Sequence, residues 1–219
     1  MKPPAPFSQP QADCALCPRL TRFRTDNAKA QPAWHNAPVP SFGGLDATVL
    51  VVGLAPGLRG ANATGRPFTG DFAGDLLYAT LLKHGFAKGH YGASADDGLH
   101  LVDTRITNAV RCVPPQNKPT TPEIHACAPF LKAEIAAMNR LQVIVTLGTI
   151  AHNAVLRALG LKLSAAPFGH GSEYHAPSGI KVIASYHCSR LNTNTRRLTP
   201  EMFGTIFARA RHLTGAAQA

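Results

Sequence analysis

Four short apolar runs constrain the fold of this chain more than any other feature. The runs span Thr48 to Gly53, Thr104 to Val110, Val143 to Leu147 and Lys181 to Tyr186. Glycine, proline or polar residues bound each run, as is typical of strands buried on both faces. Helical patterns cover Gly74 to His84, Pro122 to Asn139, Thr149 to Leu159 and Pro200 to Leu213. This alternation predicts an α/β domain with a mostly parallel sheet.

Size and charge narrow the class of protein. With 219 residues, 45% hydrophobic and 16% charged, the chain can bury one sizeable core, and we expect a single domain over residues 1–219. The Pro-rich residues 1–11 and the Gly/Ala-rich residues 214–219 are expected to be flexible. A formal charge of +10 suits a polyanionic partner, either nucleic acid or a membrane surface.

The cellular location follows from what the N-terminus contains. Met1 to Gln11 is rich in proline and polar residues and has no apolar core of a signal peptide. No apolar run approaches the roughly 18 residues that cross a bilayer. We therefore expect a cytoplasmic protein, where thiols stay reduced and disulfides are rare.

Four of the five cysteines suggest a metal site. Cys14 and Cys17 form a CxxC before the first strand, Cys112 ends the second strand, and Cys127 lies in the following helix. Such thiolate sets hold zinc or an iron–sulfur cluster, and the alternative is that Cys112 and Cys127 are ordinary core residues. A single CxxC favours iron–sulfur modestly but leaves zinc open. The fifth cysteine, Cys188, is expected to be a packed or loop thiol.

A glycine-rich loop follows the first strand, where open α/β sheets bind ligands. The Walker A spacing of Gly60 and Gly65 is followed by Arg66 and Pro67 instead of Lys and Ser/Thr, which excludes a phosphate loop. Phe68 could stack on a base, and Asp71 could steer water or stabilise positive charge. The alternative for Phe68 is an ordinary aromatic residue of the core, and the alternative for Asp71 is the N-cap of the next helix.

The loop after the last strand shares the same edge of the sheet. His187 begins it as a titratable group, and Leu191 could act as an apolar wedge between bases. The polar residues suited to phosphate contact are Ser189, Arg190, Asn192, Arg196 and Arg197. The alternatives are that His187 has only a structural role and that the arginines form a solvated face.

Three motifs in this order resemble the type 5 uracil-DNA glycosylases, the UDGb group. They are GLAPG through GRPFTGD (Gly53 to Asp71), AVRCVPPQNKPT (Ala109 to Thr120) and SYHCSRLNTNT (Ser185 to Thr195). Leu54 stands where type 4 enzymes have a glutamate. The chain departs from the type 5 pattern at Ala63, often Arg, and at Asn108, usually Ala, while Cys188 replaces a proline of type 4 enzymes.

The resemblance implies a three-layer α/β/α sandwich around a four-stranded parallel sheet. It also implies a 4Fe–4S cluster held by Cys14, Cys17, Cys112 and Cys127. We expect a monomeric, monofunctional glycosylase that acts on DNA at the nucleoid. It would excise uracil and other deaminated bases, hypoxanthine and xanthine, and leave an abasic site for base excision repair.

The resemblance also suggests roles for the loop residues. Phe68 would stack on the flipped base, His187 would donate to the uracil carbonyl, and Asp71 would orient water or stabilise the sugar cation. The pocket would be shaped by Gly53, Ala55, Pro56 and Gly57, with Asn117 facing it. Arg190, Leu191, Arg196 and Arg197 would hold the DNA. The rival interpretations are a zinc-stabilised nucleic-acid-binding module without catalysis and an electron-transfer protein.

Overall fold

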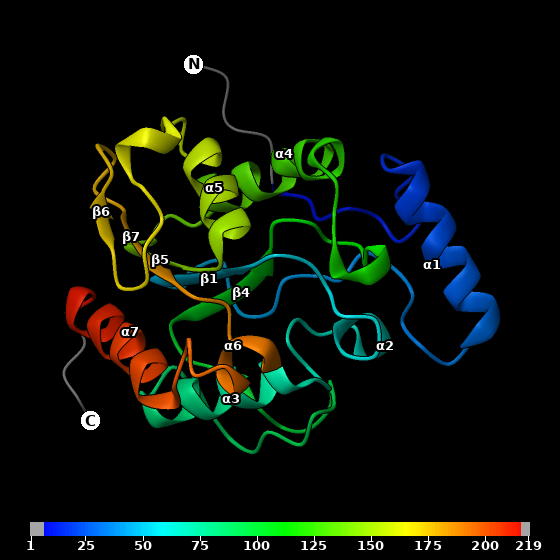
Figure 1. The fold of residues 1–219 in the computed structure, drawn as a ribbon, viewed down its shortest axis with the longest axis horizontal. Coiled ribbons are helices and arrows are strands. Elements are labelled where there is room, and N and C mark those ends of the chain that lie inside the picture. Colours follow the sequence, from blue (N-terminus) through cyan, green and yellow to red (C-terminus); the bar gives the residue numbers. More distant parts are fainter. Residues whose placement is uncertain (1–6, 216–219) are drawn as a thin grey trace.

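The computed structural model describes residues 7–215 and is built around a five-stranded sheet (Figure 1). Its strand order is β4 (Thr104–Asn108), β1 (Val49–Gly53), β5 (Val143–Leu147), β7 (Lys181–Ser185) and β6 (Glu173–His175). The first four strands are parallel, which confirms the four predicted runs. β6 adds an antiparallel edge that the sequence analysis did not predict. This strand has three residues, two of them exposed, so it lacks a buried apolar pattern.

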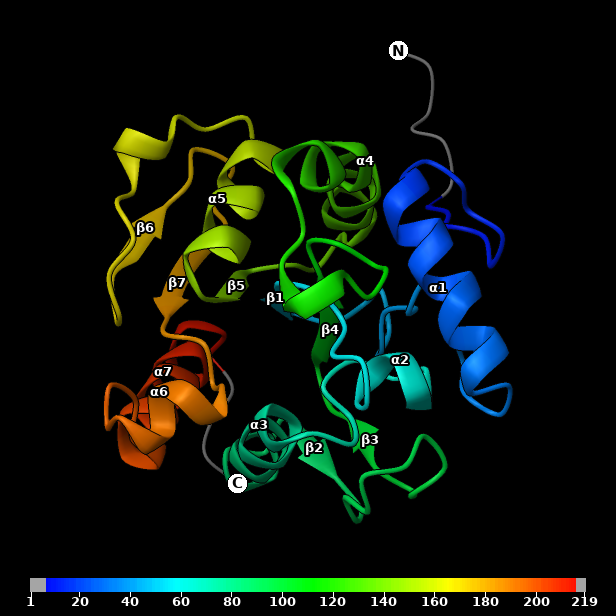
Figure 2. The same cartoon turned by 45° about the vertical axis from the view of Figure 1, so that its right-hand side comes forward.

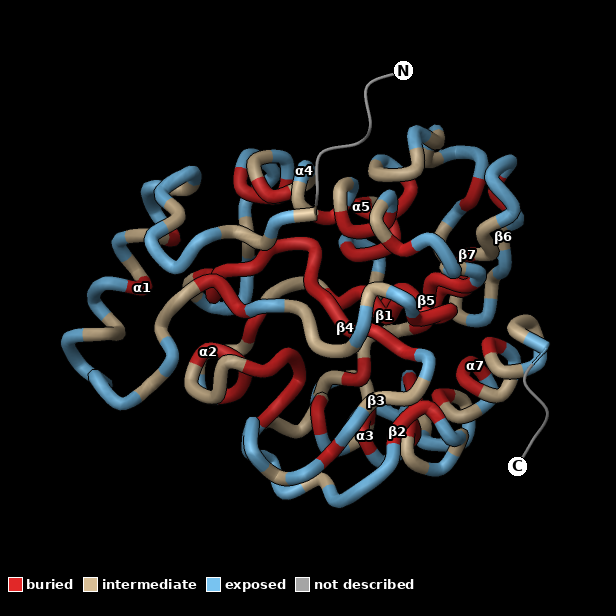
Figure 3. Tube along the Cα trace, turned by 180° about the vertical axis from the view of Figure 1, so that it is seen from behind, coloured by how far each residue is buried: buried red, intermediate tan, exposed pale blue. Residues whose placement is uncertain are grey.

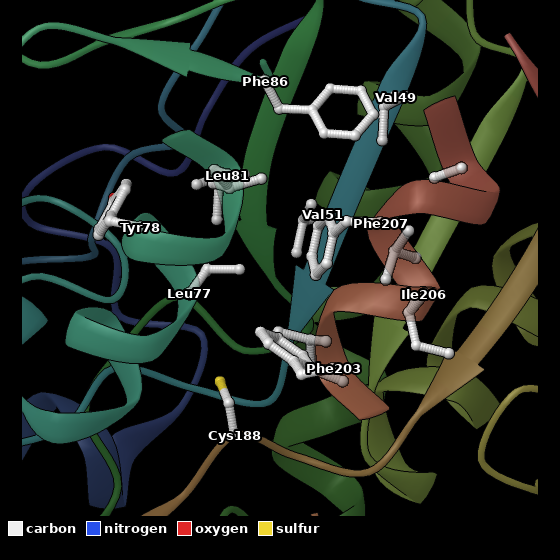
Figure 4. Close-up of a cluster of buried hydrophobic side chains, with 14 of the residues drawn as sticks. Val49, Val51, Leu77, Tyr78, Leu81, Phe86, Cys188, Phe203, Ile206 and Phe207 are labelled. Carbon is white, nitrogen blue, oxygen red and sulfur yellow. The ribbon is translucent and has the colours of Figure 1, made fainter. Parts of the chain in front are cut away.

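Helices cover both faces of the sheet, as the sandwich prediction requires. α3 (Phe72–Lys83) and α7 (Pro200–Leu213) lie on one face, and α4 (Thr121–Ala137) and α5 (Thr149–Ala158) lie on the other (Figure 1). Side chains alternate along β1 because strand residues point to opposite faces. Val49 and Val51 join the cluster of α3 and α7 (Figure 4), whereas Leu50 and Val52 join the other. The strands consequently form the buried centre of the molecule (Figure 3).

The helix starts explain how the loops are anchored. The Asp71 carboxylate caps α3 by accepting from the Gly74 N–H at 3.0 Å, and the Thr199 hydroxyl accepts from the Met202 N–H at 3.2 Å to begin α7. Glu123 accepts from the Thr120 N–H at 2.7 Å at the start of α4. The three caps fix where the chain leaves each loop.

Several short or polar elements were not predicted. They are α1 (Pro18–Ala30), α2 (Ala61–Thr64), α6 (Arg190–Asn194), the 3-10 turns Pro115–Asn117 and Leu163–Ala165, and a hairpin of β2 (Ala87–Lys88) and β3 (His100–Leu101) near α3 (Figure 2). α1 buries only Leu20 and Arg24, so it has no apolar stripe for a sequence pattern to reveal. α6 occupies part of the segment that was expected to be a loop.

The N-terminal segment expected to be flexible is partly described. The Gln9 side chain accepts from the Ser41 N–H at 2.7 Å, and the Arg105 guanidinium lies 5.6 Å from the Phe7 ring centre. Residues 7–11 therefore lie against the domain, while residues 1–6 and 216–219 are outside the described part. Between residues 7 and 215, no helix is long and apolar enough to span a membrane.

Candidate active site

A cavity lies at the carboxyl ends of the parallel strands. It has a volume of about 460 Å³, within the range of small-ligand sites. Its walls come from the loop after β1, the segment after β4 and the loop after β7. The lining residues are Leu54, Ala55, Pro56, Gly57, Ala61, Phe68, Asp71, Phe72, Ala73, Asn108, Asn117, His187, Ser189 and Arg190. The structure thus brings together the two loops that the sequence placed on one edge.

Gly53, Phe68 and Asn108 form one tight contact beside this cavity. A methyl group at Gly53 would lie 2.5 Å from the Phe68 ring and would also overlap the side-chain oxygen of Asn108. Phe68 is 7% exposed and has a φ of +53°, a left-handed conformation that an aromatic residue rarely adopts. The glycine predicted to shape the pocket is therefore needed so that two larger side chains can meet above it.

The two oxygens of the Asp71 carboxylate have different surroundings. Its Oδ1 caps α3, as the structural alternative had suggested. Its Oδ2 faces the loop after β1, because methyl groups added at Gly57 and Gly60 would lie 2.8 and 2.5 Å from it. Asp71 also lines the cavity. One oxygen is thus committed to the fold while the other lies beside the glycine-rich loop.

His187 and Phe68 both line the pocket, and their rings lie next to each other. Their ring centres are 6.0 Å apart and nearly parallel, with 29° between the planes. Burial lowers the pKa of His187 from its usual value, and the negative charge of Asp71 partly opposes this shift. The Asn192 side chain donates to the His187 carbonyl at 2.8 Å and fixes the start of the loop. Burial therefore favours the neutral imidazole, which still carries one N–H donor.

Comparisons of the sequence with known proteins identify a family. Residues 40–211 match the family model described as the uracil DNA glycosylase superfamily. The chain is 44% identical to a type-5 uracil-DNA glycosylase of Thermus thermophilus, over 95% of this chain and 97% of the relative. It is 42% identical to one of Pyrobaculum aerophilum (90% and 88% covered) and 41% identical to one of Mycobacterium bovis (92% and 78%).

The chain belongs to the type-5 uracil-DNA glycosylases. This confirms the resemblance and the sandwich fold expected from it. Members are hydrolases of N-glycosidic bonds, so the glycosylase is an enzyme and the interpretation as a binding module without catalysis is set aside.

The predicted DNA-contacting residues of the glycosylase are dispersed. Ser189 and Arg190 line the pocket, and the Arg190 guanidinium lies 5.5 Å from the Phe72 ring centre. Leu191 is 72% exposed on α6. The exposed residues Arg196 and Arg197 lie outside the pocket lining, Arg197 with its guanidinium 4.5 Å from the Tyr186 ring centre. The side-chain nitrogen of Asn192 is occupied within the loop by the His187 carbonyl.

The four predicted cluster cysteines of the glycosylase line one small cavity on the α4 face. Burial raises the pKa of Cys112 to about 12, and burial followed by repulsion from Cys127 raises the pKa of Cys17. The Arg111 N–H donates to the Cys127 sulfur at 3.4 Å. Within residues 7–215, no three His, Cys, Asp or Glu side chains are grouped to hold a single metal ion.

One residue that lines the glycosylase pocket, Asn108, was not assigned a role from the sequence. Asn108 was noted only as a departure from the family pattern, yet it lines the pocket, and its buried side-chain oxygen has no hydrogen-bond partner among the described residues. Asn117, which was assigned, also lines the pocket but is exposed, with a φ of +57°. The sequence signal that could have identified Asn108 is a polar amide at the carboxyl end of β4, where the pocket lies.

Proposed function

We propose that this glycosylase removes hypoxanthine and xanthine as well as uracil from DNA. The observation that carries the proposal is the buried, unpartnered side-chain oxygen of Asn108 in the pocket. A buried polar atom without a partner costs about 1–3 kcal/mol, a cost that a bound ligand can remove. We infer that the flipped base supplies the hydrogen-bond partner that the Asn108 oxygen lacks.

The chemistry of deaminated bases supports this breadth. Uracil, hypoxanthine and xanthine share one edge, a carbonyl oxygen beside a ring N–H, whereas cytosine and adenine present an amino group beside a bare ring nitrogen. An asparagine amide can accept from the N–H and donate to the carbonyl at the same time. The cavity of about 460 Å³ has room for a two-ring base. Guanine shares this edge, but its pair with cytosine makes flipping more costly, since flipping is easiest at mismatched bases.

The bond-breaking step needs one group for each developing charge. Cleavage leaves negative charge on the departing base and positive charge on the sugar. The neutral His187 imidazole would donate its N–H to the base carbonyl, and Phe68 would hold the base by stacking. The Asp71 Oδ2 would stabilise the sugar cation or orient the water that adds to C1′. Because water is the nucleophile, the expected product is an abasic site in an intact strand.

We further propose that the four cysteines hold a 4Fe–4S cluster. The surroundings of the cysteines support an anionic group there: the backbone N–H of Arg111 donates to the Cys127 sulfur at 3.4 Å, and the buried Arg24 guanidinium donates to the Cys14 carbonyl at 2.5 Å. Hydrogen bonds from backbone N–H groups to ligand sulfur are typical of such clusters. The cluster would tie the segment before α1 to β4 and α4, and we assign it a structural role.

A panel of duplexes tests the activity. Each duplex carries one uracil, hypoxanthine or xanthine, and base release is followed for the wild type and for Asn108→Ala. We expect release of all three bases by the wild type and a parallel loss in the variant, since all three share the edge that Asn108 would read. Release of uracil alone by the wild type would contradict the proposed breadth, and unequal losses would contradict the role of Asn108.

Iron content and visible absorbance test the cluster. We expect purified wild type to be brown with about four irons per chain, the number in a 4Fe–4S cluster. Cys112→Ser should lose iron, whereas Cys188→Ser, the matched change at the fifth cysteine, should keep it. A colourless protein that contains zinc would contradict the proposal.

A further inference from the structure

A buried ion pair joins the glycine-rich loop to the β2–β3 hairpin. The Arg66 guanidinium donates to both oxygens of Asp97, at 2.8 and 2.6 Å, and the two side chains are only 4% and 3% exposed. Asp97 also accepts from the N–H groups of Gly92 and Leu99, at 2.9 and 3.1 Å. Each oxygen of the Asp97 carboxylate thus accepts one hydrogen bond from Arg66 and one from a backbone N–H of the hairpin loop.

Aromatic rings surround the same guanidinium. It lies 5.2 Å from the ring centres of Phe42 and Tyr78 and 5.8 Å from that of Tyr91. Tyr78 and Tyr91 stack on each other with centres 4.6 Å apart. This arrangement places a planar cation on aromatic faces, where Arg and Lys are not interchangeable.

The backbone on both sides of Phe68 is held by this buried group of Arg66, Tyr78 and Tyr91. The Tyr78 hydroxyl donates to the Pro67 carbonyl at 2.6 Å, and the Arg66 Nε–H donates to the Thr69 hydroxyl at 2.7 Å. The Tyr91 hydroxyl donates to the Phe68 carbonyl at 3.5 Å and lies 3.4 Å from the Gly70 nitrogen. Each of the three consecutive residues 67–69 is therefore hydrogen-bonded to a different side chain of this buried group.

Phe68 needs such support because its backbone is strained. A non-glycine residue in the left-handed region costs of order 1–3 kcal/mol and persists only where its surroundings impose it. A buried ion pair is by itself weak evidence for stability, since its desolvation offsets its attraction. The buried pair of Arg66 and Asp97 is therefore better explained by the conformation that it imposes on the loop.

We propose that Arg66, fixed by Asp97, is a positioning residue that holds Phe68 over Gly53 and opposite His187. This inference rests on the proposed stacking role of Phe68. Arg66 does not line the pocket and would act only through the loop conformation. Its loss would lower the rate of bond cleavage in bound DNA rather than the binding of DNA.

Steady-state kinetics of uracil release from a duplex test the proposal, with Arg66→Met compared with Arg105→Met. Arg105 is the matched control because it is also a buried arginine paired with a carboxylate, Glu134, at 2.6 Å. All measurements are made well below the Tm of each variant. We expect Arg66→Met to lower kcat about 10- to 100-fold with little change in KM, the scale of a small misplacement at a reacting centre. Arg105→Met should lower Tm but leave kcat near wild type, and Arg66→Lys should recover part of kcat.

A double-mutant cycle distinguishes this role from a general one. In a Phe68→Ala background, Arg66→Met should change kcat by no more than about twofold, because coupled residues are non-additive. Three results would overturn the inference while leaving the role of Phe68 intact. The first is that Arg66→Met lowers kcat equally in the wild-type and Phe68→Ala backgrounds. The others are an unchanged kcat in Arg66→Met and a loss of kcat in Arg105→Met equal to that in Arg66→Met. Full activity of Phe68→Ala would overturn both. If Arg66→Met does not fold, Asp97→Asn serves in the same cycle with the same expectations.

Discussion

Gly53 is the residue at which β1 ends beside the pocket, and its lack of a side chain lets Phe68 and Asn108 meet. The motif around Gly53 was recognisable from the sequence, and it singled out Phe68 and Asp71, which both line the pocket. The contact with Asn108 was not, because it joins two strands far apart in the chain. The division of the Asp71 carboxylate between cap and pocket also needed the structure, since the sequence supported both alternatives equally.

Gly53→Ala should therefore block the pocket without unfolding the domain. The added methyl group would displace the Phe68 ring, and we expect kcat/KM for uracil release to fall about 100-fold, the scale of a misplaced contact at a reacting centre. Gly169→Ala is the matched control, because its methyl group would meet only Ser172, at 3.8 Å. Similar kcat/KM values for the two variants would contradict this account of the pocket.

Among the elements, the four parallel strands were predictable because β-branched residues recur in each of them, even in β4, whose sequence TRITN contains only one apolar side chain. The elements that were missed bury little apolar surface: α1 contributes two buried residues, and β6 is largely exposed. α6 was missed for the same reason, since it buries none of its five residues. Its Leu191 is largely exposed, and the wedge role of this residue stays a prediction.

Leu191→Ala should impair the enzyme on duplex DNA more than on single-stranded DNA. Flipping a base from a duplex costs a few kcal/mol, and a wedge would supply part of that energy. A loss of about 1.4 kcal/mol corresponds to a tenfold lower rate of uracil release, and we expect about this loss on the duplex. The single strand, which needs no flipping, is the internal control. Equal losses on both substrates would remove the wedge role.

At the scale of the whole molecule, three partly buried histidines oppose folding at low pH. Burial lowers the pKa of His84, His170 and His187. The unfolded chain has histidine pKa values of about 6.5 and therefore binds more protons than the folded chain below that pH. The free energy of unfolding should then fall as the pH drops below about 6.5.

Urea unfolding at about pH 7.5 and about pH 5.5 measures this effect. We expect the wild type to be less stable at the lower pH. His84→Gln should reduce the difference, because the buried Nε2 of His84 has no partner in the described structure. His90→Gln, at an exposed position, should leave the difference unchanged. A wild-type stability that is equal at both pH values would contradict the prediction.

We propose that the glycosidic bond is cleaved in the pocket between the loops after β1 and β7. Single-turnover uracil release by Asp71→Asn tests it most directly, because asparagine keeps an oxygen to cap α3 but lacks the charge beside the sugar. We expect a rate about 100- to 1000-fold below wild type, as for loss of one group that stabilises developing charge. DNA affinity and Tm should stay near wild type. A wild-type rate of release would contradict the account.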